Sequence, residues 1–392
     1  MSTYIDLEII QTLPFSNANR DDAGQPKTVR VGGTTRGRLS SQSLKRAARF
    51  YGADRSAGYG IDGDTSGGDF YRTRYLAQLI EKAVEAKGGT SEQMKKVEKI
   101  FTTGSALGKL KKEKKDNATI IRNDVLTVVT EEEIDKLADA VIADNISKET
   151  IAEILVNSGK EELALWGRFF ASSDAATLDG SAQIAHAFTT HAVTIEDDFF
   201  VGLDDAAPLF STDAGAGHPG DSLYLTGTFY KYGNFNLEET ILNLLNARME
   251  KAKLTTADMS EEDVITAVTR ITRKFLTSFI LSVPQGKIRS TAHQTLPQYV
   301  KVAVRNNRPV SGASAFDSAV TAKDVTKTSI ERLSTEHEML KRLVGAPEQE
   351  YTLTTLADVA SNTDSLDELI NKVVEALIPK VKTAVALYSQ EK

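Results

Sequence analysis

A basic and polar segment near the N-terminus carries the residue types best suited to chemistry, and that chemistry is anion binding. Arg36 and Arg38 come just before a serine, Ser40 or Ser41, that can cap a helix. Positive side chains oppose the positive end of a helix dipole, so the arrangement becomes favourable when an anion lies there. Backbone N–H groups at Ser41 and Gln42, together with Arg and Lys side chains, would then form a phosphate pocket.

The uneven distribution of charge makes RNA a reasonable anion. The formal net charge is −7, yet Asn17–Arg55 holds nine Lys or Arg against three Asp or Glu, whereas Glu131–Glu162 holds ten acids against three lysines. Phosphate attraction is screened beyond about 10 Å, so a local basic surface can bind RNA on an acidic protein. The alternative is a solvated basic loop and helix face. Gly32 and Gly33, which would let a polynucleotide backbone approach closely, favour RNA.

The sequence lacks the residues and motifs that other kinds of site require. The chain has no cysteine, which excludes disulfides, thiolate metal sites and cysteine nucleophiles. Residues 215–220 (GAGHPG) match a dinucleotide-binding motif in letters only, because Pro219 and a strand-like segment follow instead of a helix. His186 and His191 are five apart, which places them on opposite faces of a strand, and we interpret both as ordinary sheet histidines. We therefore expect no metal, no cofactor and no catalytic residue.

The elements that must position the basic segment follow from periodicity. Residues 4–12 alternate apolar and polar side chains, which predicts a half-buried strand, and residues 16–38 have the composition of an irregular loop. We expect helices at 42–51, 71–87, 92–102, 131–145, 161–170, 236–253, 261–280, 329–343 and 364–388, a long hairpin within 181–233, and a strand at 296–305. Strands this far apart predict an α+β sheet domain with large insertions.

No targeting or membrane segment is evident. The N-terminal residues lack a basic region followed by an apolar run and a cleavage site, and no stretch approaches the roughly 18 apolar residues that span a bilayer. With the absence of cysteine, this leads us to expect a cytoplasmic protein that has no contact with membranes.

Several motifs resemble those of one family. The run from residue 9 to residue 49, IIQTLPFSNANRDDAGQPKTVRVGGTTRGRLSSQSLKRAAR, is similar to the N-terminal signature of CasC, the backbone subunit of the type I-E CRISPR complex Cascade. LALWGRF (163–169), AQIAHAFTTH (182–191) and LSVPQGKIRSTAHQTLP (281–297) follow in family order. Together they cover most of the chain.

The resemblance implies a modified RRM-like (ferredoxin-like) palm, residues 1–54 and 181–392, with a β-hairpin thumb at about 197–222. A helical finger insertion would occupy 55–180. Several copies would stack along one CRISPR guide RNA (crRNA), hold its phosphate backbone and present its bases to a target DNA strand, beside other Cascade subunits. The protein would act by gripping and would not be an enzyme.

Site residues carried over by position form four groups in this sequence. The resemblance implies that RNA is bound by Asn19, Arg20 and Lys27 in the loop, by Ser40, Gln42, Lys45, Arg46 and Arg49 on the helix, by Trp166 and Arg168 at the finger–palm junction, and by Lys287 and Arg289 in a later loop. A lysine cluster would attract DNA nonspecifically: Lys109, Lys111, Lys112, Lys114 and Lys115.

Two rival functions stay open. Related backbone subunits of type III complexes cleave target RNA with an acidic loop residue and a metal, and Asp21 and Asp22 lie in a comparable loop. A protein scaffold that forms filaments without RNA is the other rival.

Overall fold

The computed structural model describes residues 2–51, 70–102, 110–115, 118–123, 126–156, 161–168, 177–202, 205, 209, 217–245 and 259–390. The strands are β1 (Thr3–Ser16), β2 (Thr28–Val31), β3 (Thr34–Leu39), β4 (Phe70–Thr73), β5 (Leu110–Lys115), β6 (Ala118–Asn123), β7 (Thr127–Thr130), β8 (Ala182–Ile184), β9 (Ala187–Thr189), β10 (Glu196–Gly202), β11 (Gly217–Asn236), β12 (Tyr299–Asn306) and β13 (Gln349–Thr354). The helices are α1 (Ser41–Arg49), α2 (Leu76–Ala86), α3 (Ser91–Thr102), α4 (Glu131–Ile142), α5 (Lys148–Val156), α6 (Glu161–Trp166), α8 (Leu237–Leu244), α9 (Glu261–Leu281), α10 (Ile288–Thr291), α11 (Val325–Val344), α12 (Leu366–Gln390) and the 3-10 helix η4 (Ala313–Phe316). Within these residues, no helix combines the length and apolar character that a bilayer span requires.

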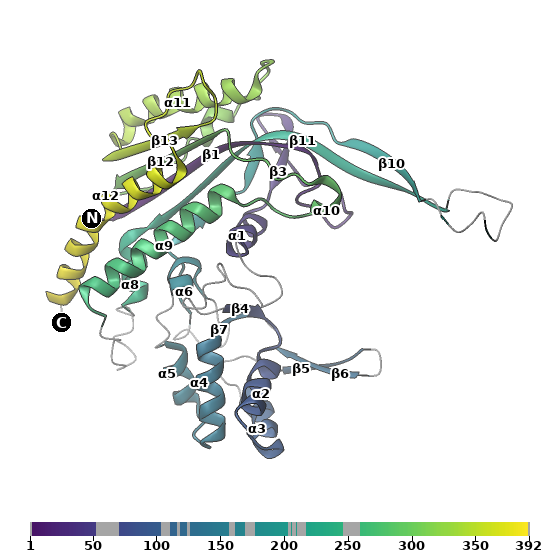
Figure 1. The fold of residues 1–392 in the computed structure, drawn as a ribbon, viewed down its shortest axis with the longest axis vertical. Coiled ribbons are helices and arrows are strands. Elements are labelled where there is room, and N and C mark those ends of the chain that lie inside the picture. The colour runs from purple at the N-terminus through teal and green to yellow at the C-terminus, as the bar shows by residue number, and fades with distance from the viewer. Residues whose placement is uncertain are drawn as a thin grey trace.

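One antiparallel sheet organises most of the chain, and β1 lies inside it between β12 and β11. The strand order is β13-β12-β1-β11-β9-β3-β2, and β8 and β10 also pair with β11. Helix α1 follows β1, and α8 and α9 follow β11, so β12, β1, β11 and β8–β9 have the βαββαβ order of a ferredoxin-like sheet. The expected α+β fold is confirmed. Figure 1 shows α9 on one side of this sheet and α11 on the other.

The side chains of β1 alternate between two faces, and both faces are covered. Ile5, Leu7 and Ile9 are fully buried in the core that α8, α9 and α12 share with the sheet. Asp6 and Glu8 point to the opposite face and are only 2% exposed, because α11 packs there. The prediction of a half-buried strand was therefore wrong.

Buried carboxylates on the α11 side are tolerated because each has polar partners. Asp6 accepts hydrogen bonds from the Tyr232 hydroxyl over 2.8 Å and from the backbone of Val310 over 3.0 Å, and Arg305 lies 3.1 Å away. Glu8 accepts from the Tyr230 hydroxyl and contacts His337 of α11. This network occupies the face that an isolated ferredoxin-like sheet would leave open.

A long hairpin leaves the sheet at β11. Strand β10 pairs with the first part of β11 from Glu196 opposite Tyr224 to Gly202 opposite Gly217. Figure 1 shows the two strands projecting together from the body of the molecule. Phe199 and Phe200, on β10, are 65% and 50% exposed.

The segment between α1 and β8 builds a core of its own. Helices α2, α3, α4 and α5 pack around residues that include Ile80, Val84, Leu137 and Val141, and the two-stranded sheet β4–β7 covers one end with Val129. The helix expected at 71–87 begins only at Leu76, since the residues before it form β4.

Several short strands were missed by the sequence analysis. Strands β2 and β3 form a hairpin where an irregular loop was expected. Strand β5, which contains most of the lysine cluster, pairs with β6. Their polar composition hides any alternation of buried and exposed positions.

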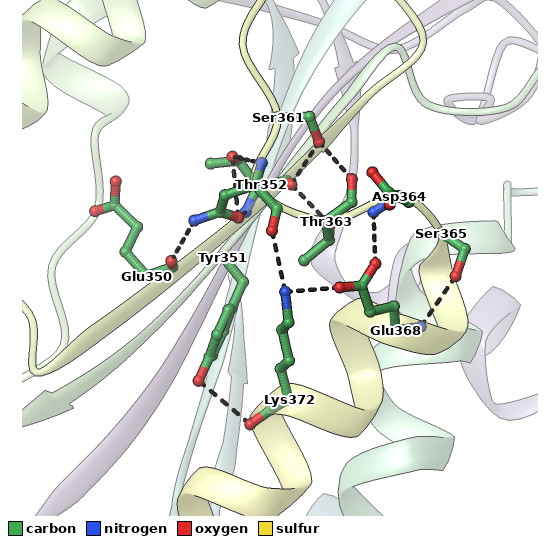
Figure 2. A network of polar contacts seen from close by, with 10 residues as sticks. Glu350, Tyr351, Thr352, Ser361, Thr363, Asp364, Ser365, Glu368 and Lys372 are labelled. Carbon is green, nitrogen blue, oxygen red and sulfur yellow. Dashed lines mark hydrogen bonds and ion pairs between the residues drawn. The ribbon is translucent and has the colours of Figure 1, made fainter.

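Strand β13, which was also missed, lies at the edge of the main sheet, and its outer side is covered by a loop. Asn362 accepts from the backbone N–H of Thr352 over 2.7 Å and donates to the carbonyl of Glu350 over 2.9 Å. Ser361 and Thr363 both donate to the carbonyl of Thr352 over 2.8 Å, as Figure 2 shows. The loop thus satisfies backbone groups that would otherwise invite pairing with another chain.

Candidate nucleic-acid interface

A cavity of about 910 Å³ separates α1 from the insertion, and it gathers residues that lie far apart in the sequence. Its lining comprises Asn19, Ser40, Gln42, Ser43, Lys45, Arg46, Arg49, Phe50, Arg72, Leu126, Val128, Trp166, Gly167, Arg168, Thr177, Leu178, Asp179 and Gly180. The lining side chains thus include five cations and one acid. Eight of the twelve residues expected to bind RNA are among them.

Helix α1 is set by its first turn. The backbone of Ser40 is extended, and its side chain accepts a hydrogen bond from the N–H of Ser43. Asn19 fixes the cap in turn, since its Oδ1 accepts from the Ser40 N–H over 2.8 Å. Ser40 rather than Ser41 is therefore the N-cap, and the loop before β2 is joined to the start of the helix.

The two sides of α1 then diverge in character. Leu44, Ala47 and Ala48 are buried beneath it, while the basic side chains of Lys45 and Arg46 face the cavity. The guanidinium of Arg46 lies 4.4 Å from the centre of the Phe50 ring, an attractive cation–π contact that holds it at the cavity edge.

Burial raises the energy of the charged groups in the cavity. The pKa of Lys45 is lowered by burial. Burial lowers the pKa of Arg49 to about 10; Glu162 opposes this shift, and the positive charges of Arg72 and Arg46 add to it. Closely spaced cations on a partly desolvated surface are stabilised when an anion lies between them.

The junction between the insertion and the sheet forms the floor of the cavity. Gly167 has φ of +73°, and a Cβ there would lie 2.5 Å from the backbone nitrogen of Gly180. Only glycine permits this approach. Next to it, Arg168 forms a β-bridge with Leu178. Trp166 packs against Phe275 of α9, and its indole Nε1–H is buried and meets no acceptor in the described part of the chain.

Arg168 lies at the cavity, but its guanidinium is engaged elsewhere. It forms a buried ion pair with Glu133 of α4 and donates to the carbonyl of Leu155. This geometry favours a positioning role, in which Arg168 holds the insertion against the junction.

The start of α1 does not form the phosphate pocket that the sequence analysis predicted. Arg36 is fully buried and donates to Thr34, to the carbonyl of Thr189 and to the carbonyl of Phe316. The Ser41 N–H already donates to Nδ1 of His186 over 3.2 Å. Arg36 and the Ser41 N–H were therefore wrongly expected to face an anion. A single sequence could not show this, because the acceptors come from β9 and from the segment around η4.

The loop residues lie on a second basic surface beside the cavity. Arg20 is exposed and bridges to Pro26, while Lys27 is half-buried and, with Asn19 and Arg38, lines a small cavity of about 10 Å³.

The later loop adjoins this surface. The Gly286 N–H donates to the carbonyl of Ala18, which joins the loop before α10 to the loop that carries Asn19. Lys287 Nζ donates to the Ser222 hydroxyl over 2.6 Å and lies 5.1 Å from the Tyr224 ring, at the root of the β10–β11 hairpin. Arg289 is exposed.

Two other groups of expected residues stand apart from the cavity. Asp21 closes a turn by accepting from the N–H of Gln25 over 2.9 Å, and Asp22 is exposed beside it. Among the described residues, no three His, Cys, Asp or Glu side chains lie close enough together to hold a metal ion.

Lys111 is exposed on β5, which also contains Lys112, Lys114 and Lys115, and Lys109 lies outside the described residues.

Arg72 and the β4–β7 sheet are the part of the site that the sequence analysis missed. Tyr71 and Val129 pair across the two strands and pack in the core of the insertion, so their neighbours Arg72 and Val128 face the cavity. An isolated arginine in a four-residue strand carries no motif that would have identified it.

The chain is similar to known proteins over most of its length. The family model described as CT1975-like protein matches residues 5–377. A chain of a solved CRISPR RNA-guided surveillance complex, in a pre-nicking form, is 31% identical, with 95% of this chain and 99% of that chain covered and a TM-score of 0.75. A chain of another CRISPR RNA-guided surveillance complex is 27% identical over the same shares, with a TM-score of 0.56. No curated protein matches the chain.

Proposed function

Because the chain belongs to the CT1975-like protein family, we propose that it is the guide-RNA-binding backbone subunit of a CRISPR surveillance complex of type I-E. In this role it is not an enzyme. Several copies stack along one crRNA, and each holds a short stretch of the sugar-phosphate chain.

The observation that carries this proposal is the basic cavity between α1 and the insertion. It brings Asn19, Lys45, Arg46, Arg49 and Trp166 to one surface, although they span nearly 150 residues of sequence. Cationic and amide side chains suit phosphate and ribose oxygens, and such contacts position a strand without reading its bases. Base pairing with the target DNA strand would then supply the specificity.

The hairpin and the insertion would serve as the thumb and the fingers of this subunit. We assign the thumb to the β10–β11 hairpin, with exposed Phe199 and Phe200 available to contact bases, and the fingers to residues 55–180. Strand β5, on which Lys111 is exposed, would face the target DNA, and neighbouring copies and other Cascade subunits would cover further surfaces.

The test is copurification of the chain with the RNA and subunits of its own CRISPR locus, followed by sequencing of the bound RNA. We expect short repeat-derived guides in uniform stoichiometry, in particles whose length grows with guide length. A matched variant, Lys45→Ala with Arg46→Ala, should yield less RNA at equal folded protein. Particles that assemble to the same length without RNA would instead identify a protein scaffold.

Catalysis is tested in the same preparation. The purified complex should leave complementary RNA intact in Mg²⁺. Cleavage that disappears in Asp21→Ala or Asp22→Ala would overturn the non-catalytic assignment and favour an RNA-cleaving subunit.

A further inference from the structure

Arg72 is the one cation of the cavity that comes from the β4–β7 sheet, and its direction is fixed by the strand pairing. Tyr71 packs against the insertion core, and its hydroxyl donates to Glu131 over 2.6 Å at the surface. Arg72 is therefore turned to the opposite face, opposite Val128, and lines the cavity across from α1. Its side chain is exposed.

The groups around Arg72 indicate what it faces. Arg46 and Arg49 lie on the facing side of the same cavity, so three guanidinium groups from two parts of the fold converge on one space. Trp166 also lines this cavity, beside the three guanidinium groups.

We propose that Arg72 is a phosphate ligand and that one phosphodiester group of a single-stranded RNA bridges it to Arg46 and Arg49 of α1. The guide thereby links the insertion to the sheet, and its binding fixes the distance between them. This inference rests on the proposed function and adds to it a residue and a position for the strand.

Electrostatic repulsion between the arginines favours the binding of a phosphate. Three convergent guanidinium groups repel one another. Burial is the main cause of the lowered pKa of Arg49, and the positive charges of Arg72 and Arg46 add to it against the opposing effect of Glu162. A phosphate removes that repulsion and accepts charge-assisted hydrogen bonds from guanidinium forks on both sides. Lysine at position 72 keeps the charge but cannot form a bidentate contact.

The experiment measures binding of a single-stranded guide RNA to the full chain over a range of salt concentrations. Arg72→Ala should weaken binding about tenfold and reduce the slope of log affinity against log salt by about 0.7, the value for one lost phosphate contact on a single strand. Arg72→Lys should restore the slope but only part of the affinity. Lys82→Ala, which removes an exposed cation from α2 of the same insertion, should change neither.

A double-mutant cycle then tests the shared phosphate. Arg46→Ala and Arg72→Ala should be strongly non-additive, because the second loss removes a contact to a group already released. Additive effects, or an unchanged slope in Arg72→Ala while the wild-type chain binds RNA, would sink the inference and leave the proposed function intact. Failure of the wild-type chain to bind RNA would instead remove the proposed function.

Discussion

The backbone N–H of Gly286 donates to the carbonyl oxygen of Ala18, with 3.0 Å between the two atoms. This contact joins two loops whose basic residues were expected to bind RNA, although 268 positions separate them. A Cβ at position 286 would lie 2.5 Å from the Ala18 carbonyl oxygen and 2.6 Å from that of Asn17. Both are backbone atoms, so the two loops must move apart to accept a side chain.

We therefore predict that Gly286→Ala lowers the free energy of unfolding by about 1–3 kcal/mol. It should also weaken guide binding, since Asn19 and Lys287 would no longer be held on one surface. Urea denaturation and RNA titration measure the two effects. Gln285→Ala, at the exposed neighbouring position, is the control, and an unchanged Gly286→Ala variant would show that the contact is dispensable.

Lys287 lies at the root of the hairpin and links it to the later loop. Its ammonium group donates to Ser222 and faces the Tyr224 ring, which stacks on Phe15 with 4.3 Å between ring centres. Removing the ammonium should loosen the root by about 1 kcal/mol. We predict that Lys287→Ala speeds amide hydrogen exchange at β10 and the paired part of β11.

The contribution of the Lys287 charge to RNA binding can be separated from its contribution to the hairpin. Ser222→Ala removes the same hydrogen bond and retains the cation, so it should speed exchange in a similar way without reducing the salt dependence of guide binding. Lys287→Ala should reduce it. Equal salt dependence in the two variants would show that Lys287 contacts no phosphate.

Local chemistry explains why α1 could be predicted from the sequence. A serine cap followed by Leu44 and Ala48 on one face and Lys45 and Arg49 on another defines a helix and its two sides within ten residues. The positions of its cations needed no knowledge of distant segments. The same holds for α9 and α12, whose apolar periodicity is long and regular.

The features that the sequence did not reveal depend on contacts between distant segments. Arg36 is sequestered by carbonyl groups from Thr189 and Phe316, and Asp6 and Glu8 are covered by α11, more than 300 residues later. Arg72 is brought to α1 only by the folding of the insertion. In each case the residue type was visible, and the face to which it turns was set by tertiary structure.

The network under α11 should make stability depend on pH. Burial raises the pKa of Asp6 from 3.8 to about 7, against the opposing effects of Val310, Tyr232 and Arg305. Between these two values the folded chain binds a proton that the unfolded chain has released. The stabilisation from this carboxyl group is therefore present below pH 4 and is lost as the pH rises through 7.

Asp6→Asn removes this titration while keeping a side chain of the same shape. We predict that the difference in unfolding free energy between wild type and Asp6→Asn shifts by about 1 kcal/mol per pH unit between about pH 4 and 7, in favour of the variant as the pH rises. Urea denaturation at several pH values measures it. A difference that does not change with pH would show that Asp6 is ionised throughout.

Asn362 covers the edge of the main sheet by acting as a substitute strand. Its side-chain amide makes the two hydrogen bonds with Thr352 and Glu350 that a neighbouring strand would make. Asn362→Ala would leave an N–H and a carbonyl open on β13, beside the carbonyl that Ser361 and Thr363 still cover.

We expect Asn362→Ala to lower the free energy of unfolding by about 1–2 kcal/mol and to increase self-association with protein concentration, because an open strand edge pairs with other chains. Asn362→Asp is the graded control, since it retains the acceptor for Thr352 and loses the donor to Glu350. It should fall between wild type and Asn362→Ala in both urea denaturation and sedimentation velocity. If Asn362→Ala stays monodisperse at every concentration at which wild type does, the remaining contacts from Ser361 and Thr363 suffice to protect the edge.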